Sequence, residues 1–487
     1  MEKNISNKSN WPTFDEITQP RIICFGVGNG SGSKLLQSYL DGHPQIYMIP
    51  GYQLMYLYPH WYQWKEELKY YWNWNIIIEA LCLKHSSIID SRNIPAHDGL
   101  RELGENRDQW IEIDVNFFKS FLHYLLDKKQ INFKNFLLAI HYAYSYVRGE
   151  DLSQKRVLIY HLHVHEYVPK YMIHDFPDMY IIGLIRDPRS NIYGRYNSTV
   201  RLDRDKLNTT DSEVYYRRSF LNIWTFFSES LECLKCCDLD RVRLVRHEDM
   251  NYCLEDLMRS IAHFIEIDFH PCLLKSTFGG LLWWGSRIYD MKPMNKPNPR
   301  IISKDWQKQI SPVDWFIIEG LFYDYCVKYG YEIERYKEKT IIKKFILFFA
   351  LFFPMSYEVK IIKQYLNFKN YKSFYKASIE EAQGRVELKD YQSNAYYRHK
   401  WYNTSLNLCQ EPWYKRILKK TLNSNQNNMN NLFLNKMIKK IYIIINSLRY
   451  LNAILVFPVN IIQRYILCVR QYYHLINKTS CLPEKLL

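Results

Sequence analysis

The sequence predicts an α/β protein with three layers: a mostly parallel central sheet, helices on both of its faces, and a helical C-terminal extension. Short apolar runs at 21–28 and 179–185 have the length and composition of buried strands, and residues 241–246, RVRLVR, suggest another strand. Segments with helical spacing lie between and around them, among them 252–266. Strands that alternate with helices along a chain are typical of parallel sheets covered on both faces.

The predicted elements follow in chain order. Residues 21–28, RIICFGVG, predict a strand that leads into a glycine-rich turn, and residues 34–40 predict a helix that ends before Gly42-His43-Pro44. Residues 156–165 alternate and are rich in β-branched side chains, which favours a strand. The continuous apolar run at 179–185 predicts a strand buried on both faces. Two long segments, 61–90 and 108–145, are predicted to be helical.

The composition limits which classes of protein the chain can belong to. The chain has 487 residues, of which 47% are hydrophobic, so it can bury a sizeable core. Its eleven cysteines have no paired spacing, which favours a reducing compartment and gives no support for a zinc site. The first twenty residues lack the apolar stretch of a secretory signal, and we therefore expect a cytoplasmic protein.

The net charge of +15 is concentrated in the C-terminal third. From Tyr331 to Leu487 there are 26 Lys and Arg against 10 Asp and Glu, whereas the first 330 residues hold 39 against 40. A nucleic-acid-binding enzyme would carry its basic groups near its chemistry. We therefore expect no nucleic-acid partner.

We predict three regions: an N-terminal tail (1–20), a main domain (21–331) and a basic, helical extension (332–487) with an Asn-rich linker at 423–431. Short apolar patches in the extension, such as 345–353, are flanked by Lys and Arg and are far shorter than the ~20 residues that cross a bilayer. Three interpretations stay open: helices that lie on an anionic membrane surface, a basic face for a polyanionic glycan, or a helical cap. The first would make the protein peripheral at the inner face of the membrane.

The turn that follows the first strand, GVGNGSGSK, is suited to binding an anion. Its glycines permit close backbone approach, and the amides of the following helical turn point at a bound anion. Ser33 separates Gly32 from Lys34, so this is not a Walker A loop. The candidate binding residues of the turn are Gly28, Gly30, Ser31, Gly32, Ser33 and Lys34.

Arg186 comes directly after the buried strand 179–185. Ligands of open α/β sheets bind beyond the carboxyl ends of the strands, so Arg186 is expected in the same crevice as the turn. A guanidinium there can bind a phosphate with two hydrogen bonds. A structural pairing with a nearby carboxylate is the alternative.

The ordered motifs resemble the sulfotransferases that use 3′-phosphoadenosine 5′-phosphosulfate (PAPS). The resemblance covers roughly residues 21–331. It rests on Ser31-Gly32-Ser33-Lys34-Leu35-Leu36, Leu40-Asp41-Gly42-His43-Pro44, Arg186-Asp187-Pro188-Arg189, Arg246-His247-Glu248-Asp249-Met250, Lys304-Asp305-Trp306 and Lys328-Tyr329-Gly330-Tyr331. It implies that the turn, with Leu35, holds the 5′-phosphosulfate and that Arg186 holds the 3′-phosphate.

The chain departs from the family pattern at two positions. Gly30 replaces the basic residue that steadies the bridging oxygen, so Lys34 is the expected cation. Gly194 stands where the family has a serine for the 3′-phosphate, and Ser190 or Ser198 are candidate replacements. Arg287, in the Pro-rich basic loop 283–300, is a further candidate for the nucleotide phosphates, although a solvated loop is an equal alternative.

A base must accept the proton of the acceptor hydroxyl. His161, His163 and His165 alternate on the predicted strand 156–165 and would face one side. The family spacing favours His163 as base, with His161 in the neighbouring role and Glu112 or Asp114 as alternatives. We expect no metal, although three imidazoles on one face also allow a metal site.

These observations predict a sulfotransferase that moves a sulfuryl group from PAPS to a hydroxyl of a carbohydrate or glycolipid. A kinase-like nucleotide-dependent enzyme is one alternative. A membrane-associated glycan-binding protein with a relict nucleotide site is another.

Overall fold

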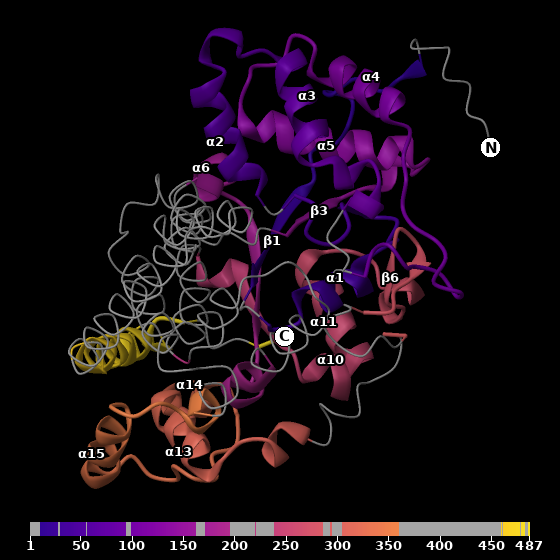
Figure 1. Cartoon of the computed structure of the whole chain (residues 1–487). Helices are drawn as coiled ribbons and strands as arrows, with labels where there is room; N and C mark the ends of the chain where they lie inside the picture. The colour runs from indigo at the N-terminus through magenta and orange to yellow at the C-terminus, as the bar shows by residue number, and fades with distance from the viewer. Residues whose placement is uncertain are drawn as a thin grey trace, which may run out of the picture. The chain divides into compact units, whose positions relative to one another are not determined.

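The computed structural model describes residues 10–27, 30–54, 56–93, 99–161, 171–194, 220, 238–285, 293–294, 304–359, 459, 461–477, 479–482 and 486–487 (Figure 1). Its internal contacts divide the chain into two compact units. Unit 1 comprises Met1–Arg201, Phe226–Gln309 and Lys478–Leu487, and unit 2 comprises Leu202–Thr225 and Ile310–Asn477. The predicted region boundaries stay predictions, and the linker at 423–431 lies outside the described residues.

Unit 1 is built on a five-stranded sheet in the order β2-β3-β1-β4-β5, in which every pair of neighbours is parallel. The strands are β1 (Arg21–Val27), β2 (Ile46–Met48), β3 (Val157–Tyr160), β4 (Tyr180–Ile185) and β5 (Val242–Arg246). A hairpin, β6 (Thr277–Phe278) with β7 (Leu281–Leu282), is separate from the sheet. The α/β class and the parallel central sheet are confirmed.

The sequence did not predict two strands of the sheet as the structure has them: β2 was not predicted, and β3 is shorter than expected. β2 is only three residues long, too short for a pattern in the sequence, and it pairs with β3 through Ile46 opposite Val157. The predicted strand 156–165 is shorter in the structure, because β3 ends at Tyr160 and His161 lies just beyond it. Residues 162–170 lie outside the described part of the chain.

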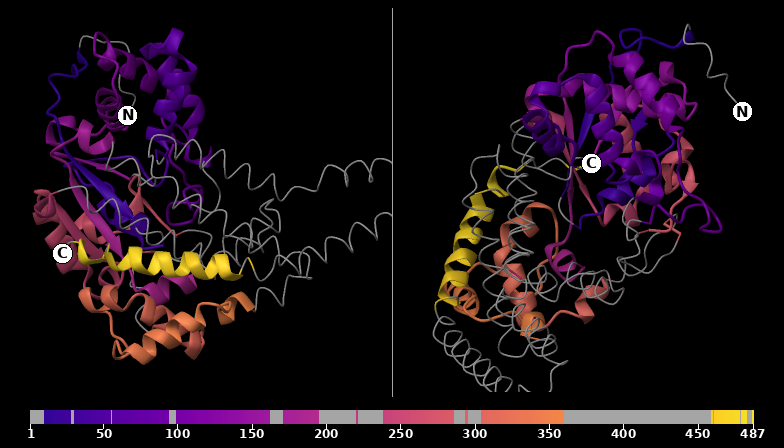
Figure 2. Two further views of the ribbon diagram at one scale, coloured as in Figure 1. Left: turned by 90° about the vertical axis from the view of Figure 1, so that its left-hand side faces the viewer. Right: turned by 45° about the horizontal axis from the view of Figure 1, so that its top comes forward.

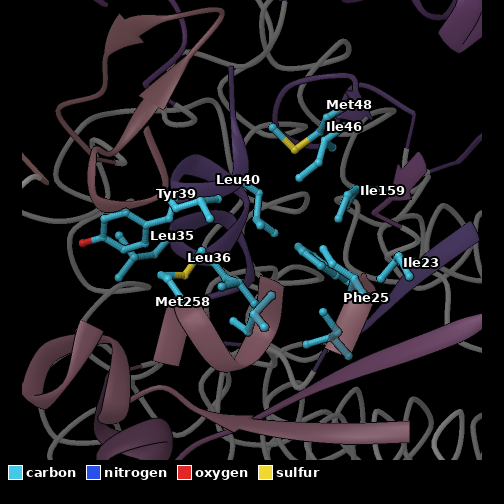
Figure 3. Packing of buried hydrophobic residues seen from close by; sticks show 14 of the residues in the cluster. Ile23, Phe25, Leu35, Leu36, Tyr39, Leu40, Ile46, Met48, Ile159 and Met258 are labelled. Carbon is cyan, nitrogen blue, oxygen red and sulfur yellow. The ribbon is translucent and has the colours of Figure 1, made fainter. Parts of the chain in front are cut away.

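Helices cover both faces of the sheet. On one face, α1 (Ser33–Leu40) and α11 (Leu254–Ile265) pack on alternate residues of β1, as Figure 3 shows for Phe25, Leu36 and Met258. On the other face lies α5 (Phe133–Val147), whose Tyr142 ring is 5.2 Å from that of Tyr47 in β2. Buried apolar contacts on both faces hold the strand ends in place.

The predicted helix at 108–145 is wrong in its first part. Residues 111–113 are extended, with the Ile113 amide bonded to the Ile89 carbonyl, and α4 (Val115–Leu126) begins only after them. The other α-helices in the described part of unit 1 are α2 (Leu57–Glu67), α3 (Trp74–Lys84), α6 (Ile173–Asp175) and α10 (Asp249–Tyr252). The 3₁₀ turns in the same residues are η2 (Lys69–Tyr71), η3 (Ser86–Ile88), η4 (Ser91–Asn93), η6 (Leu152–Gln154), η9 (Leu239–Arg241), η10 (Pro271–Leu274) and η11 (Asp305–Lys308).

The described part of unit 2 is helical. It contains α13 (Pro312–Leu321), α14 (Tyr323–Lys328), α15 (Ile341–Ala350) and a helix at 461–477, drawn in yellow in Figure 2. The rings of Phe352, just after α15, and Tyr465 stack at 3.7 Å, which joins these two helices. None of the helices in the described ranges is long and apolar enough to cross a membrane.

Candidate active site at the carboxyl edge of the sheet

The turn between β1 and α1 depends on two glycines in the left-handed region. Gly30 has φ 79° and Gly32 has φ 84°, backbone conformations that residues other than glycine adopt only with steric strain. A Cβ on Gly32 would also lie 2.2 Å from Nδ1 of His247. Conformation and space therefore both require glycine at position 32. Gly28 lies outside the described residues.

The turn presents polar groups that suit an anion. The Ser31 hydroxyl is buried, with 1% of the residue exposed, and it has no hydrogen-bond partner among the described residues. Gly32, at the N-cap of α1, has no side chain to cap the helix amides. The Ser33 hydroxyl lies 3.4 Å from that of Tyr52. A buried hydroxyl that has no partner among the described residues, next to a helix N-terminus without a capping side chain, can donate to a bound phosphate or sulfate.

The structure brings Arg186 to this turn. Its Nη1 donates to the Gly30 carbonyl at 2.9 Å, and its Nη2 donates to the Ser190 hydroxyl at 2.8 Å. A Cβ at Gly194 would be 3.5 Å from the Arg186 guanidinium, an ordinary contact distance. Ser190 therefore contacts the Arg186 guanidinium, the same group that a serine at position 194 would approach. Ser198 lies outside the described residues.

Lys34 and His161 both contact the ring of Tyr52. The Lys34 ammonium is 4.3 Å from the centre of the Tyr52 ring, and the His161 ring centre is 4.6 Å from it. Nδ1 of His161 is 3.4 Å from the side-chain oxygen of Gln37 in α1. A cation and an imidazole therefore lie against the same tyrosine ring. His163 and His165 lie outside the described residues.

His247 is a residue of the site that sequence reasoning did not select. It follows β5, its amide donates to the Ile185 carbonyl at 2.8 Å, and its imidazole is buried over Gly32. Burial holds its pKa well below the usual value, and the charge of Arg186 lowers the pKa further. The ring is therefore neutral at pH 7. The motif at 246–250 marked this strand end, but no signal in it shows the contact with Gly32.

Several other residues belong to the motifs at 186–189 and 246–250, and their contacts hold the segments that follow β4 and β5. Asp187 forms two hydrogen bonds with the Arg189 guanidinium, which lies 4.7 Å over the Trp306 ring. The Glu248 carboxylate accepts from the Asp187 amide at 3.1 Å. Burial raises the pKa of Glu248, as does Asp187, whereas Arg186 lowers it. These contacts fix the backbone from which Arg186 projects.

The remaining candidates have other positions. Glu112 is exposed and pairs with Arg92 at 3.1 Å. Asp114 caps α4, accepting from the amides of Asn116 and Phe117. Leu35 is buried in the core beneath the turn (Figure 3). Arg287 lies outside the described residues, and among those described no group of three or more His, Cys, Asp or Glu could hold a metal ion.

Comparison with known families decides the class. The profile of the sulfotransferase family matches residues 20–271, which include all five strands, the turn and Arg186. The chain belongs to the sulfotransferase family. Among solved structures, this sulfotransferase is similar to the sulfotransferase domain of the Synechococcus PCC 7002 olefin synthase. The two are 20% identical, with 59% of this chain and 87% of that one covered and a TM-score of 0.32.

A second similar structure is the sulfotransferase domain of the curacin biosynthetic pathway, 16% identical, with 53% of this chain and 78% of that one covered and a TM-score of 0.30. The comparison with curated proteins gave no match.

Proposed function

We propose that this sulfotransferase transfers the sulfuryl group of PAPS to a hydroxyl of a carbohydrate acceptor. The observation that carries the proposal is the contact between the Arg186 guanidinium and the Gly30 carbonyl of the turn, at 2.9 Å. It joins two anion-binding elements: the uncapped start of α1 and an arginine beyond β4. A donor with a 5′-phosphosulfate and a separate 3′-phosphate has the two anionic ends that such a site would hold.

In this proposal the turn amides and the Ser31 hydroxyl bind the 5′-phosphosulfate, while Arg186 and Ser190 bind the 3′-phosphate. Lys34 supplies the positive charge that the family places at position 30. Bound PAPS supplies an activated sulfuryl group: the acceptor oxygen forms a bond to sulfur as the bond from sulfur to the bridging oxygen breaks. A cation beside that oxygen stabilises the charge that develops on the leaving bisphosphate.

The proton of the acceptor hydroxyl goes to a histidine base. The contacts of His161 with Tyr52 and Gln37, and of Lys34 with the same Tyr52 ring, support His161 in this role. The sequence spacing favours His163, two residues further along the chain. An imidazole can act as a general base.

We propose a carbohydrate or glycolipid as acceptor, and a cytoplasmic location at the inner face of a membrane. The support is the charge distribution: the 26 basic against 10 acidic residues after position 330 suit an anionic glycan or a lipid headgroup. A transfer assay with labelled PAPS and a panel of glycans and glycolipids tests this part of the proposal.

Donor binding is tested with Arg186→Ala. Titration calorimetry with adenosine 3′,5′-bisphosphate should show binding to the unaltered protein and an affinity about 100-fold lower in the variant, since a charge-assisted bidentate contact is lost. Arg259→Ala is the matched control, because Arg259 is an exposed arginine paired with Glu255 on α11. Equal affinity in all three proteins would contradict the proposal. Tighter binding of ATP with magnesium would instead indicate a kinase-like enzyme.

A further inference from the structure

The outward face of α15 is apolar, the reverse of a usual surface helix. Five large apolar side chains in this ten-residue helix are exposed: Ile341 (88%), Ile342 (72%), Phe345 (73%), Ile346 (49%) and Phe349 (59%). Their spacing of one, three and four residues places them on one side of the helix. We call these five residues the α15 apolar face.

The opposite side of the helix already packs on unit 2. Leu347 is fully buried, and a Cβ on Gly320 of α13 would come within 2.9 Å of it. The Phe348 ring lies 5.3 Å from that of Tyr472. The Thr340 hydroxyl caps the helix by accepting from the Lys343 amide. Within the described residues, the α15 apolar face therefore has no part in holding this helix in place, and its exposure of so many large apolar groups requires another explanation.

The charge beside this face is positive. Lys343 and Lys344 lie in the first turn of α15, and residues 339–357 contain no Asp or Glu. Lys339, just before the helix, is paired with Asp324 at 2.8 Å and so adds little to this charge. The helix at 461–477 repeats the pattern: its exposed residues include Ile462, Ile466 and Tyr473 together with Arg470. Apolar side chains bordered by lysine and arginine match the acyl boundary and the anionic headgroups of a lipid surface.

We propose that α15 lies in the interface of an anionic membrane, with its apolar face among the acyl chains and Lys343 and Lys344 at the headgroups. A second copy of this chain is a poorer occupant. Pairing would bring like charges together, and the face offers roughly 650 Å², below the ~800 Å² per partner of a stable interface. The chain's own segment 360–458 carries 17 Lys and Arg against five Asp and Glu, so its charge does not complement the lysines either.

Vesicle flotation of the full chain tests the proposal. The unaltered protein should float with phosphatidylcholine vesicles that contain phosphatidylglycerol. Phe345→Ser combined with Phe349→Ser should lower the partition coefficient at least about tenfold, because both rings leave the acyl region. Val327→Ser is the matched control: Val327 is also exposed (58%) and belongs to α14 of the same unit, and this variant should float like the unaltered protein.

The lysines are tested separately with Lys343→Gln combined with Lys344→Gln. Binding to the anionic vesicles should fall about fivefold per lysine, with no change for phosphatidylcholine alone. Thermal unfolding and circular dichroism of every variant verify the fold, since these side chains are at least partly exposed. The proposal is overturned if the unaltered protein fails to float, or if Val327→Ser lowers flotation as much as the phenylalanine variant. It is also overturned if the lipid-free chain dimerises through the two phenylalanines.

Discussion

At the scale of single residues, the contact between Gly32 and His247 links the glycine-rich turn to the end of β5. The imidazole occupies the space that any side chain at position 32 would need. Because burial keeps this ring neutral, it packs beside Arg186 without adding a second positive charge. His247 therefore shapes the turn, while Arg186 and Lys34 supply its charge.

Gly32→Ala should abolish detectable binding of adenosine 3′,5′-bisphosphate and lower the melting temperature more than Gly149→Ala does. Gly149 is the matched control because its φ is 79° and no atom lies within 4 Å of an added Cβ. Gly149→Ala measures the cost of the left-handed conformation, about 1–2 kcal/mol, and Gly32→Ala adds the collision with His247. In the double variant with His247→Ala, the additional loss of stability should shrink. A Gly32→Ala protein as stable as Gly149→Ala would contradict this geometry.

At the scale of elements, buried carboxylates hold the loops of unit 2 to its helices. Glu319 of α13 accepts hydrogen bonds from the amides of Glu334, Arg335 and Tyr336 and from the Trp315 indole. Asp314 accepts from the amides of Ser356 and Tyr357 in the same way. Glu358 accepts from the amides of Phe220 and Met355 and pairs with Arg464. Backbone donors that no helix or strand satisfies are thus satisfied by side chains.

Glu319→Gln should destabilise the protein by about 3 kcal/mol, because an amide nitrogen would replace an oxygen that faces buried N–H donors. Glu338→Gln, a change in an exposed acid of the neighbouring loop, is the control and should leave stability unchanged. Urea unfolding followed by tryptophan fluorescence measures both variants. Equal midpoints for the two would show that the carboxylate is not needed there.

At the scale of the whole molecule, buried neutral imidazoles predict a loss of stability in mild acid. Burial lowers the pKa of both His43 and His141 from 6.5 to about 4, and it also lowers the pKa of His85 and His247. The unfolded chain therefore binds more protons than the folded one between pH 6.5 and 4. The stabilisation is complete above pH 6.5 and declines as the pH falls toward 4.

Urea unfolding at pH 7, 5.5 and 4.5 should show this decline. His141→Asn should make this decline shallower by removing a contribution of about 3 kcal/mol, since His141 is fully buried and its pKa is lowered from 6.5 to about 4. The range from pH 6.5 to 5 lies above the titration of ordinary carboxylates, so the histidines dominate it. A free energy of unfolding that stays constant across this range would refute the assignment.

Sequence patterns predicted some elements better than others. The run at 179–185 corresponds to β4, because a strand buried on both faces needs continuous apolar residues. The segment 241–246 corresponds to β5, and over residues 241–244 buried apolar residues alternate with half-buried arginines. β2 was missed because three residues are too few to show an alternation of apolar and polar side chains. Residues 108–114 were wrongly assigned to a helix, because their apolar spacing also fits an extended segment. Tyr52 and the three carboxylates of unit 2 carried no signal in the sequence, since their roles depend on partners far along the chain.

By itself the sequence determined the α/β class, the glycine-rich turn and the arginine beyond a buried strand. These follow from local composition and from the rule that parallel strands end at one edge. Only the tertiary structure decided that Arg186 reaches the Gly30 carbonyl, that Lys34 and His161 share Tyr52, and that His247 fills the space over Gly32. Such contacts join residues up to 215 positions apart. Their distances depend on strand order and register, which no local pattern encodes.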